Sequence, residues 1–366
     1  MFYRDTWLEV DLDAYAYNIR YLLKHTQKQM IAVVKANGYG MTALVAAKEA
    51  MAAGASMVAV ANFDEALDLR NRGFCDDILV LGVTRPDSVL AAKKNNIILT
   101  MPSLTWAKSV AQSGISGLRL HLKIETGMNR LGLESPKEAQ AALVVLKDQS
   151  VEGIFTHYSS SDDANNDYND LQYNRFVKVL KSLDHPFQWI HCSNSDAALH
   201  YKEEHTNAFR PGCALLGVPA APSELKLVYG FYTKINHLKQ LEAGQAISYG
   251  REYTTQAKEW IATVPVGYAD GLRRANSGYE VYISGQRYPF VGRICMDQAM
   301  IRLDSFLPLG TTVELFGPHI PIQEMAERLK TIPLDIYTSI SDRVTRVYRK
   351  HGEVDQIINP RFDFPI

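Results

Sequence analysis

Residues 30–40 read MIAVVKANGYG, an apolar run that ends at Lys35 and is followed by the pair Asn37-Gly38. A short apolar run rich in β-branched residues, closed by a turn signal such as Asn-Gly, indicates a buried β-strand. Lys35 therefore stands where a strand leaves the core. A lysine desolvated in this way has a lowered pKa, which suits attack by its amine on an aldehyde.

The same pattern recurs through the first 220 residues. Further apolar runs lie at Met57–Ala61, Ile78–Val83, Ile97–Met101, Leu118–Ile124, Gly153–Tyr158, Gln188–His191 and Phe209–Val218. Stretches with helical spacing lie between them, at Asp13–Lys28, Thr42–Ala53, Asp64–Arg72, Pro136–Lys147 and Asp167–Leu183. Asn62 and Glu65 have the spacing of a capping box, which predicts that a helix begins there. Eight strands alternating with helices predict a (β/α)8 TIM-type barrel, with a doubly wound open sheet as the alternative.

After about residue 228 the helical stretches give way to closely spaced strands. The predicted strands are Val228–Asn236, Ala246–Tyr249, Glu259–Val266, Glu280–Ile283, Gln286–Val291, Met300–Leu303 and Thr312–Leu315. Glycine-containing turns separate them, and one short helix is expected at Ile322–Lys330. We therefore expect an α/β barrel domain over residues 1–228 and a mainly β domain over residues 229–366. The first few residues are expected to pack on the second domain.

Composition narrows the classes of function. The 39 basic and 40 acidic side chains give a formal net charge of -1, so no basic excess is present to neutralise nucleic acid. The 4 cysteines contain no CxxC pair and favour a reducing compartment. At the N-terminus, acidic residues break up the apolar run that a signal peptide would need. The sequence contains no run of 18 apolar residues, so we expect no membrane contact from this chain itself. We expect a cytoplasmic protein, or the cytoplasmic domain of a longer membrane-anchored one.

Several polar residues and one glycine lie at or near the C-terminal ends of the predicted barrel strands. They are Lys35, Tyr39, Lys123, Arg130, His157, Asn194, Ser195, Arg210 and Gly212. Taken singly, each has a structural explanation, because a strand-end lysine is usually solvated and a lone histidine usually belongs to the fold. Their joint placement is more informative, since the active sites of such barrels form at the C-terminal ends of the strands.

Competing motifs are weak. The run HYKEEH (residues 200–205) places its histidines five apart, which puts them off a common helical face and matches no zinc spacing. Neither a Walker loop nor a GxGxxG fingerprint is present. We therefore expect no metal and no nucleotide.

Segments spread along the chain resemble one known family, the fold-type III alanine racemases, which include the serine racemase domains of vancomycin-resistance proteins. The matching segments are AVVKANGYG (32–40), HLKIETGMNRLG (121–132), SNS (193–195), RPG (210–212), SYG (248–250), PVGYADG (265–271) and GRICMDQ (292–298). They stand in the family's order and spacing over essentially the whole chain. The resemblance implies an amino-acid racemase with pyridoxal 5′-phosphate as cofactor.

The resemblance also implies a role for residues of the barrel. Lys35 would bind the cofactor aldehyde and act as acid and base on the D-side of the substrate Cα. The phosphate would be held by Tyr39, Ser195 and the backbone of Gly212 and Cys213, with Asn194 beside them. Arg210 would face the pyridine nitrogen and Arg130 the phenolic oxygen. Lys123 occupies a position that is often carbamylated in relatives, where the added charge would pair with Arg130.

The second domain would complete the site of another subunit. Tyr249 would be the base on the L-side, with His157 beside it, and Met296 and Tyr268 would approach the substrate. The implied assembly is a homodimer with shared active sites. Two opposed acid–base groups agree with the chemistry, because racemisation removes a proton from one face and returns it to the other.

One residue departs from the family pattern. The tyrosine of the family's late motif is replaced here by Asp342, in ISDRVTR (340–346). A carboxylate beside a phosphate needs a partner, for which Arg343 and Arg346 are candidates. Aspartate is smaller than the tyrosine it replaces, so Asp342 leaves more space. Its carboxylate could also accept a hydrogen bond from a substrate hydroxyl, and such a hydrogen bond discriminates well between substrates.

We therefore expect serine to be used, alongside or ahead of alanine, with D-amino acid supplied for peptidoglycan precursors and a role in vancomycin resistance. The alternatives are a strict alanine racemase and, more remotely, a non-catalytic pyridoxal-phosphate-binding protein. A decarboxylase of the same fold type is disfavoured by CMDQ (295–298) and by Arg210.

Overall fold

The computed structural model describes residues 3–163, 167–218 and 224–362. By internal contacts the chain divides into two compact units, which we describe separately. The barrel unit comprises Tyr15–Lys226, and the β unit comprises Met1–Ala14 together with Leu227–Ile366. The N-terminal residues thus belong with the C-terminal part of the chain.

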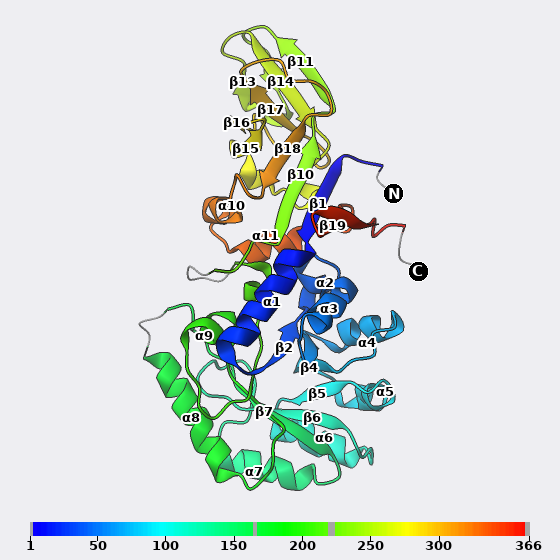
Figure 1. Ribbon diagram of the computed structural model, residues 1–366, viewed down its shortest axis with the longest axis vertical. Coiled ribbons are helices and arrows are strands. Elements are labelled where there is room, and N and C mark those ends of the chain that lie inside the picture. Colours follow the sequence, from blue (N-terminus) through cyan, green and yellow to red (C-terminus); the bar gives the residue numbers. More distant parts are fainter. Residues whose placement is uncertain (1–2, 164–166, 219–223, 363–366) are drawn as a thin grey trace. The chain divides into compact units, whose positions relative to one another are not determined.

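The barrel unit is built on a closed barrel of parallel strands (Figure 1). The strands are β2 (Gln29–Val33), β3 (Met57–Val60), β4 (Ile78–Val83), β5 (Ile98–Met101), β6 (Arg119–Lys123), β7 (Ser150–Phe155), β8 (Trp189–His191) and β9 (Ala208–Phe209). The predicted (β/α)8 barrel is confirmed. Strands such as β3 and β5 are buried along their whole length, because the barrel interior covers one face and helices cover the other.

Helices alternate with the barrel strands, and five of them fall on the stretches with predicted helical spacing. The helices are α1 (Leu12–Thr26), α2 (Lys35–Tyr39), α3 (Ala43–Ala52), α4 (Phe63–Asn71), α5 (Val89–Lys94), α6 (Leu104–Gln112), α7 (Pro136–Val145), α8 (Tyr168–Ser182) and α9 (Ser195–His200). The eighth strand is much shorter than predicted. Only Ala208–Phe209 pair in the barrel, and the rest of the apolar run contains a 3-10 helix, η2 (Cys213–Leu216), because Pro211 and Gly212 interrupt the strand.

The β unit contains a seven-stranded sheet in the order β16-β15-β18-β10-β1-β19-β20 and a three-stranded sheet in the order β11-β14-β17. Its strands are β1 (Thr6–Asp11), β10 (Tyr229–Lys234), β11 (His237–Leu241), β12 (Ala246–Ile247), β13 (Tyr253–Thr254), β14 (Glu259–Val264), β15 (Glu280–Ile283), β16 (Gln286–Pro289), β17 (Ala299–Leu303), β18 (Thr312–Phe316), β19 (Thr345–Lys350) and β20 (Glu353–Ile358). Its helices are α10 (Ile322–Leu329) and α11 (Pro333–Ser339).

Strand β1 explains why the first residues join the β unit. It pairs antiparallel with β10 and parallel with β19, so it is an interior strand of the larger sheet. Leu8 and Val10 are fully buried, while Glu9 and Asp11 point away from the core. Glu9 and Asp11 are therefore the outward positions of an alternating strand.

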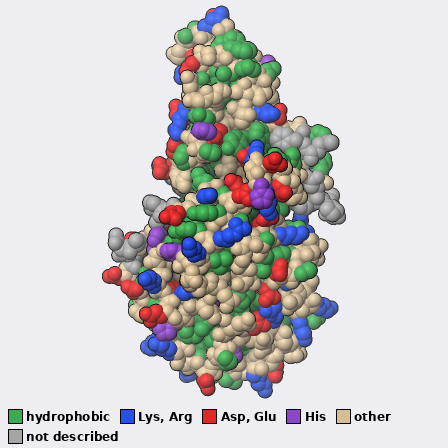
Figure 2. Space-filling model, in the orientation of Figure 1, with side chains coloured by type: hydrophobic (Ala, Val, Ile, Leu, Met, Phe, Trp, Pro, Cys, Tyr) green, Lys and Arg blue, Asp and Glu red, His purple; other side chains and the backbone are tan. Residues whose placement is uncertain are grey.

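The distribution of charged side chains on the surface is consistent with the nearly equal numbers of acidic and basic residues in the sequence. On the face shown in Figure 2, acidic and basic side chains are interspersed. Within the described residues, no helix is both long and apolar enough to cross a membrane.

Candidate active site

Lys35 lies just beyond the C-terminal end of β2, and its side chain is half-buried. Burial lowers the pKa of its ammonium group, and the charge of Arg130 lowers that pKa further, against an opposite effect of Glu65. The amine is therefore neutral more often than that of a solvated lysine. A neutral amine is the form that attacks a carbonyl group.

The backbone after Lys35 has an unusual conformation. Ala36, Asn37, Gly38 and Tyr39 all have positive φ, between 52° and 66°. Three of these residues carry a Cβ, and left-handed φ in such residues costs on the order of 1 kcal/mol each. Tertiary contacts must offset that strain. The predicted Asn-Gly turn is therefore part of a longer constrained loop.

Glu65 provides one of those contacts and links the loop to the end of β3. Its carboxylate accepts a hydrogen bond from the Ala36 amide at 2.7 Å and another from the Ala61 amide at 2.7 Å. The Asn62 side chain caps α4 by accepting from the Glu65 amide at 2.9 Å. The predicted helix start is thus confirmed, but Glu65 reaches across to the loop that follows Lys35. The sequence pattern alone did not identify this role.

Arg210 is 3% exposed and follows the end of β9. Its Nη2 donates to the Thr156 and Cys192 carbonyl oxygens, at 2.7 and 2.9 Å, and lies 3.1 Å from His157 Nδ1. Its Nη1 lies 2.5 Å from His191 Nδ1. Burial lowers the pKa of Arg210 to about 10, which still leaves the guanidinium charged at neutral pH. The structure thus presents a fixed cation in the barrel.

Two further barrel residues carry shifted pKa values. Burial lowers the pKa of Lys123 to about 8, and its Nζ donates to the Ile124 carbonyl oxygen at 2.7 Å. Burial, followed by the charge of Arg210, holds the pKa of His157 well below its usual range. Because Arg210 can only donate, His157 accepts at Nδ1 and carries its proton on Nε2. Arg130 is exposed in the loop after β6.

A cradle of backbone amides lies around Ser195, at the start of α9. Ser195 Oγ accepts hydrogen bonds from the Gly212 amide at 2.9 Å and from the Ala214 amide at 3.1 Å. Both acceptor positions of that oxygen are occupied, so its hydroxyl can act only as a donor. A Cβ on Gly212 would overlap the Tyr39 hydroxyl, so the glycine lets that hydroxyl approach the backbone closely. Burial raises the pKa of the neighbouring Cys213 to about 11.

Asn194 has a local structural role beside this cradle. Its side chain caps α9 by accepting from the Ala197 amide at 3.1 Å, and it also accepts from the Ser161 hydroxyl at 2.7 Å. The cap fixes the first residue of the helix, which is Ser195. Asn194 therefore positions the cradle through the backbone.

The predicted barrel residues fit pyridoxal phosphate by the chemistry of their groups. Lys35 offers an amine with a lowered pKa, which suits an aldehyde, and the cradle brings the Ser195 and Tyr39 hydroxyls to the Gly212 backbone, which suits a phosphate. Arg210 offers a fixed guanidinium that suits an unprotonated ring nitrogen. The structure brings these groups together at the C-terminal ends of the barrel strands.

The three residues assigned to the substrate side belong to the β unit, and all are exposed. Tyr249 is 71% exposed, Met296 51% and Tyr268 42%. Tyr249 begins the 3-10 turn η3 (Tyr249–Arg251), and Tyr268 begins η4 (Tyr268–Asp270). Large apolar or aromatic side chains at this exposure are available to a neighbouring surface.

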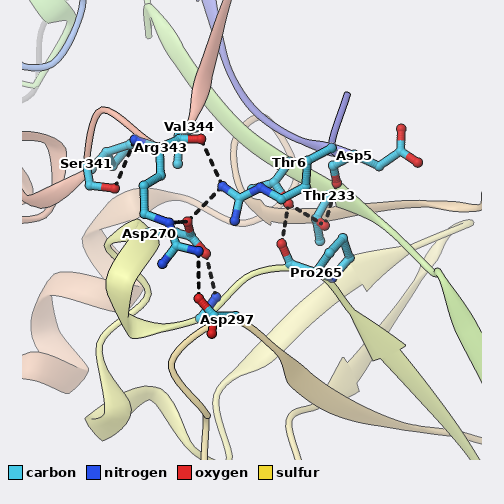
Figure 3. Close-up of polar contacts among 12 residues, drawn as sticks. Asp5, Thr6, Thr233, Pro265, Asp270, Asp297, Ser341, Arg343 and Val344 are labelled. Atoms are coloured by element: carbon cyan, nitrogen blue, oxygen red, sulfur yellow. Dashed lines mark hydrogen bonds and ion pairs between the residues drawn. The ribbon is translucent and has the colours of Figure 1, made fainter. Parts of the chain in front are cut away.

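A buried carboxylate ties the segments that carry these residues together. Asp270 has a fully buried side chain, which accepts from Arg4 at 2.7 Å and from the Gly267 amide at 3.0 Å. Arg343 lies 3.6 Å from Asp270 and donates to Asp297 at 2.6 Å (Figure 3). The network therefore fixes the GYADG loop against the segments around Asp297 and Arg343. Sequence reasoning had singled out GYADG but not this role of Asp270.

Asp342 is exposed beside this network. Arg343, one of its two predicted partners, forms ion pairs with Asp270 and Asp297 instead. Arg346, the other, is buried and donates to the carbonyl oxygens of Ile340, Ser341 and Val344. Burial lowers the pKa of Arg346, and the charge of Asp342 partly opposes that effect.

Comparison of the sequence and the structure with known proteins finds alanine racemases in each case. Residues 10–220 match the family described as "Alanine racemase, N-terminal domain", and residues 228–348 match "Alanine racemase, C-terminal domain". The chain is 40% identical to an alanine racemase from Geobacillus kaustophilus, over 98% of each protein. It is similar to a crystal structure of alanine racemase from Bacillus anthracis with bound L-Ala-P (TM-score 0.94, 38% identity, 100% of both chains). It is also similar to a histidine racemase from Leuconostoc mesenteroides (TM-score 0.89, 28% identity, 95% of this chain and 99% of that one).

Proposed function

This chain belongs to the alanine racemase family, whose cofactor is pyridoxal 5′-phosphate, and from that premise we propose that it interconverts L- and D-alanine. In our proposal Lys35 exchanges the Cα proton on the D-side and Tyr249 of a second subunit exchanges it on the L-side. The D-alanine formed would supply peptidoglycan precursors.

The observation that carries this proposal is the placement of Lys35. It is the half-buried lysine of the strand-end group, its pKa is lowered by burial, and a constrained loop holds its backbone. A base that returns a proton to the same carbon must be held within hydrogen-bonding reach of that carbon throughout turnover. Loop rigidity supports that role better than a flexible strand end would.

The barrel residues have distinct tasks around Lys35. When bound, the cofactor withdraws electrons from Cα and so acidifies its hydrogen. In the proposal Ser195, Tyr39 and the Gly212 and Cys213 backbone hold the phosphate, while Arg210 faces the ring nitrogen. Arg210 stays charged and so would keep that nitrogen unprotonated, which would moderate electron withdrawal and disfavour transamination.

A dimer with shared active sites follows from the assignment of Tyr249. Its side chain is 71% exposed within its own chain, as a residue acting across a subunit interface would be. Met296 and Tyr268 have the same character and are proposed to approach the substrate from the same side. A tyrosine base needs a nearby positive charge, and in the dimer the guanidinium of Arg210 of the other subunit would supply it, with the neutral His157 hydrogen-bonded to that guanidinium.

The comparisons support alanine as the substrate better than they support serine. The curated relatives are alanine racemases, which favours the strict alanine racemase over the serine-using enzyme expected from Asp342. Serine is kept as a second candidate because Asp342 is an exposed carboxylate that could accept from a hydroxyl. A vancomycin-resistance role depends on that candidate.

Deuterium exchange tests the main proposal and its closest rivals. The purified holoenzyme in D2O should incorporate deuterium at Cα of both L- and D-alanine. A non-catalytic cofactor-binding protein would show no exchange, and a decarboxylase would release CO2. K35A should remove exchange from both enantiomers, and its failure to do so would overturn the role of Lys35.

Mixing two inactive variants tests the shared site. K35A and Y249F dimers, when mixed and allowed to exchange subunits, should regain up to about a quarter of wild-type activity. This follows because half of the dimers are mixed and one of their two sites is intact. No regain after proven subunit exchange would mean that Lys35 and Tyr249 act within one chain.

Replacing Asp342 tests the serine candidate. D342Y should lower kcat/KM for L-serine relative to L-alanine if Asp342 accepts the substrate hydroxyl. Loss of a hydrogen bond to the substrate hydroxyl changes selectivity by about tenfold or more. Unchanged selectivity would remove serine as a candidate and leave alanine racemisation untouched.

A further inference from the structure

Inside the barrel, three buried side chains form one hydrogen-bonded row. Arg210 Nη1 lies 2.5 Å from His191 Nδ1, and His191 Nε2 lies 2.9 Å from His121 Nδ1. His191 ends β8 and His121 lies in the middle of β6, and both are 0% exposed. The row leads from Arg210 into the centre of the barrel.

The direction of every hydrogen bond in this row is determined by Arg210. Arginine has only donors, so His191 must accept at Nδ1. A neutral imidazole has a single N–H, which on His191 is therefore at Nε2 and donates to His121 Nδ1. The proton of His121 is then on its own Nε2, which has no partner among the described residues.

Both histidines are neutral, which this arrangement requires. Burial lowers the pKa of His121 to about 3, and the charges of Arg119 and Arg210 add to that effect. Burial, followed by the charge of Arg210, holds the pKa of His191 well below its usual range. A second cation beside Arg210 would be unfavourable in this interior.

Gly153 makes the row possible. Strand β7 lies between β6 and β8, and Gly153 pairs in register with His121. A Cβ at Gly153 would stand 2.6 Å from the His121 ring, inside van der Waals contact. Because Gly153 has no side chain, the His121 ring has room to reach His191. On its other side His191 stacks on Phe155, at 4.8 Å between ring centroids.

We propose that His121 is a positioning residue, which acts through His191 to fix the orientation of the Arg210 guanidinium. With an acceptor at His121, His191 keeps its proton on Nε2 and leaves Nδ1 to accept from Arg210. Without that acceptor, the other tautomer of His191 would bring an N–H against an Arg210 N–H. The proposal rests on the proposed function, in which Arg210 faces the cofactor ring.

Three variants separate positioning from mere packing. H121L fills the space but removes the acceptor, whereas H121N retains an acceptor oxygen near the place of Nδ1. G153A leaves every polar group intact and displaces the His121 ring. H121L and G153A should therefore behave alike, and H121N should resemble the wild type. If H121L fails to fold, G153A still tests the proposal, because the same loss of the His121 acceptor is expected of it.

The tautomers can be read directly by nitrogen NMR on the holoenzyme with ¹⁵N-labelled histidine, with H121N used to assign the His121 signal. His121 and His191 should both be neutral Nε2–H tautomers from about pH 6 to about pH 9. A His191 signal that titrates in this range, or that carries its proton on Nδ1, would overturn the proposal. This readout does not depend on which amino acid the enzyme racemises.

The effect on the site is read from cofactor binding. H121L and G153A should raise the Kd for pyridoxal phosphate and lower kcat, each by about tenfold, and should shift the absorbance maximum of the bound cofactor. H121N should stay within about twofold of the wild type. Wild-type cofactor affinity and spectrum in both H121L and G153A would overturn the positioning role. An inactive wild type with the expected tautomers would instead count against alanine racemisation.

Discussion

Gly212 offers a sharp test of the phosphate cradle. A methyl group at this position would overlap the Tyr39 hydroxyl, and the next atom of that ring, Cζ, would be 3.1 Å away. Tyr39 is 7% exposed and cannot turn out to solvent without disturbing the core. The Gly212 amide is itself fixed by its hydrogen bond to Ser195. Neither side of the contact can move freely.

G212A should therefore weaken cofactor binding. Overpacking of a rigid contact costs about 1–3 kcal/mol, and a central value of about 2 kcal/mol is roughly a thirtyfold rise in Kd. Absorbance titration of the apoprotein with pyridoxal phosphate measures this Kd, and Y39F is the matched control. Y39F/G212A removes the hydroxyl but keeps the tight contact with Cζ, so it should recover about 1 kcal/mol relative to the additive expectation.

Two results would refute this reasoning. One is a G212A variant that binds the cofactor as tightly as the wild type. The other is strict additivity of Y39F and G212A, which would mean that the methyl group and the hydroxyl do not meet. The unfolding temperature of each variant must be measured beside its Kd, because global destabilisation would weaken binding without any local clash.

The other predictions concern titration and the buried ion pairs. With its pKa lowered to about 8, Lys123 should take up ¹³C-labelled bicarbonate as a carbamate more readily as pH rises through 8, giving an NMR signal that K123Q lacks. The rate of cofactor capture by the apoprotein should rise with pH as Lys35 loses its proton, and R130A should move that rise to higher pH, because the Arg130 charge lowers the Lys35 pKa. D270A should lower the free energy of unfolding by about 3 kcal/mol in urea denaturation, because it leaves Arg4 and Arg343 facing an emptied buried site. D297A, whose pair with Arg343 is exposed, should change it by no more than about 1 kcal/mol.

The barrel was predictable because its signal is local. Each barrel strand is short, and the inner and outer faces are both buried, so its residues form a continuous apolar run that stands out between helices. The polar residues that follow these runs must lie at one rim, since the strands of a barrel are parallel. Lys35, His157, Ser195 and Arg210 were found in this way.

Strand β1 was not predicted, although the first few residues were expected to pack on the second domain. Strand β1 is covered by β10 and β19, which follow it by more than 200 residues, and its alternating pattern is only six residues long. The prediction of the eighth strand, Phe209–Val218, was wrong in its length. Its apolar run continues past Pro211 and Gly212, but apolar character does not distinguish a strand from a buried 3-10 turn.

The supporting residues of the site could not be identified from sequence spacing. Glu65 matched a capping box, and its second function depends on the loop after Lys35 lying beside the end of β3. His121 and His191 lie inside apolar runs, where a histidine is indistinguishable from a structural one until Arg210 is seen beside it. Asp270 belonged to a recognised motif, but its partners Arg4 and Arg343 come from opposite ends of the chain.

Glu203 shows how a misleading motif can conceal a structural role. It belongs to the run HYKEEH, whose histidines do not match a metal site, and its side chain is fully buried. It accepts from the hydroxyl groups of Tyr158 and Ser193, each at 2.7 Å. Those residues are the neighbours of His157 and of the Asn194–Ser195 pair. A buried carboxylate is tolerated only when it is well hydrogen-bonded, so the same bonds that stabilise Glu203 also hold the two loops that carry the site.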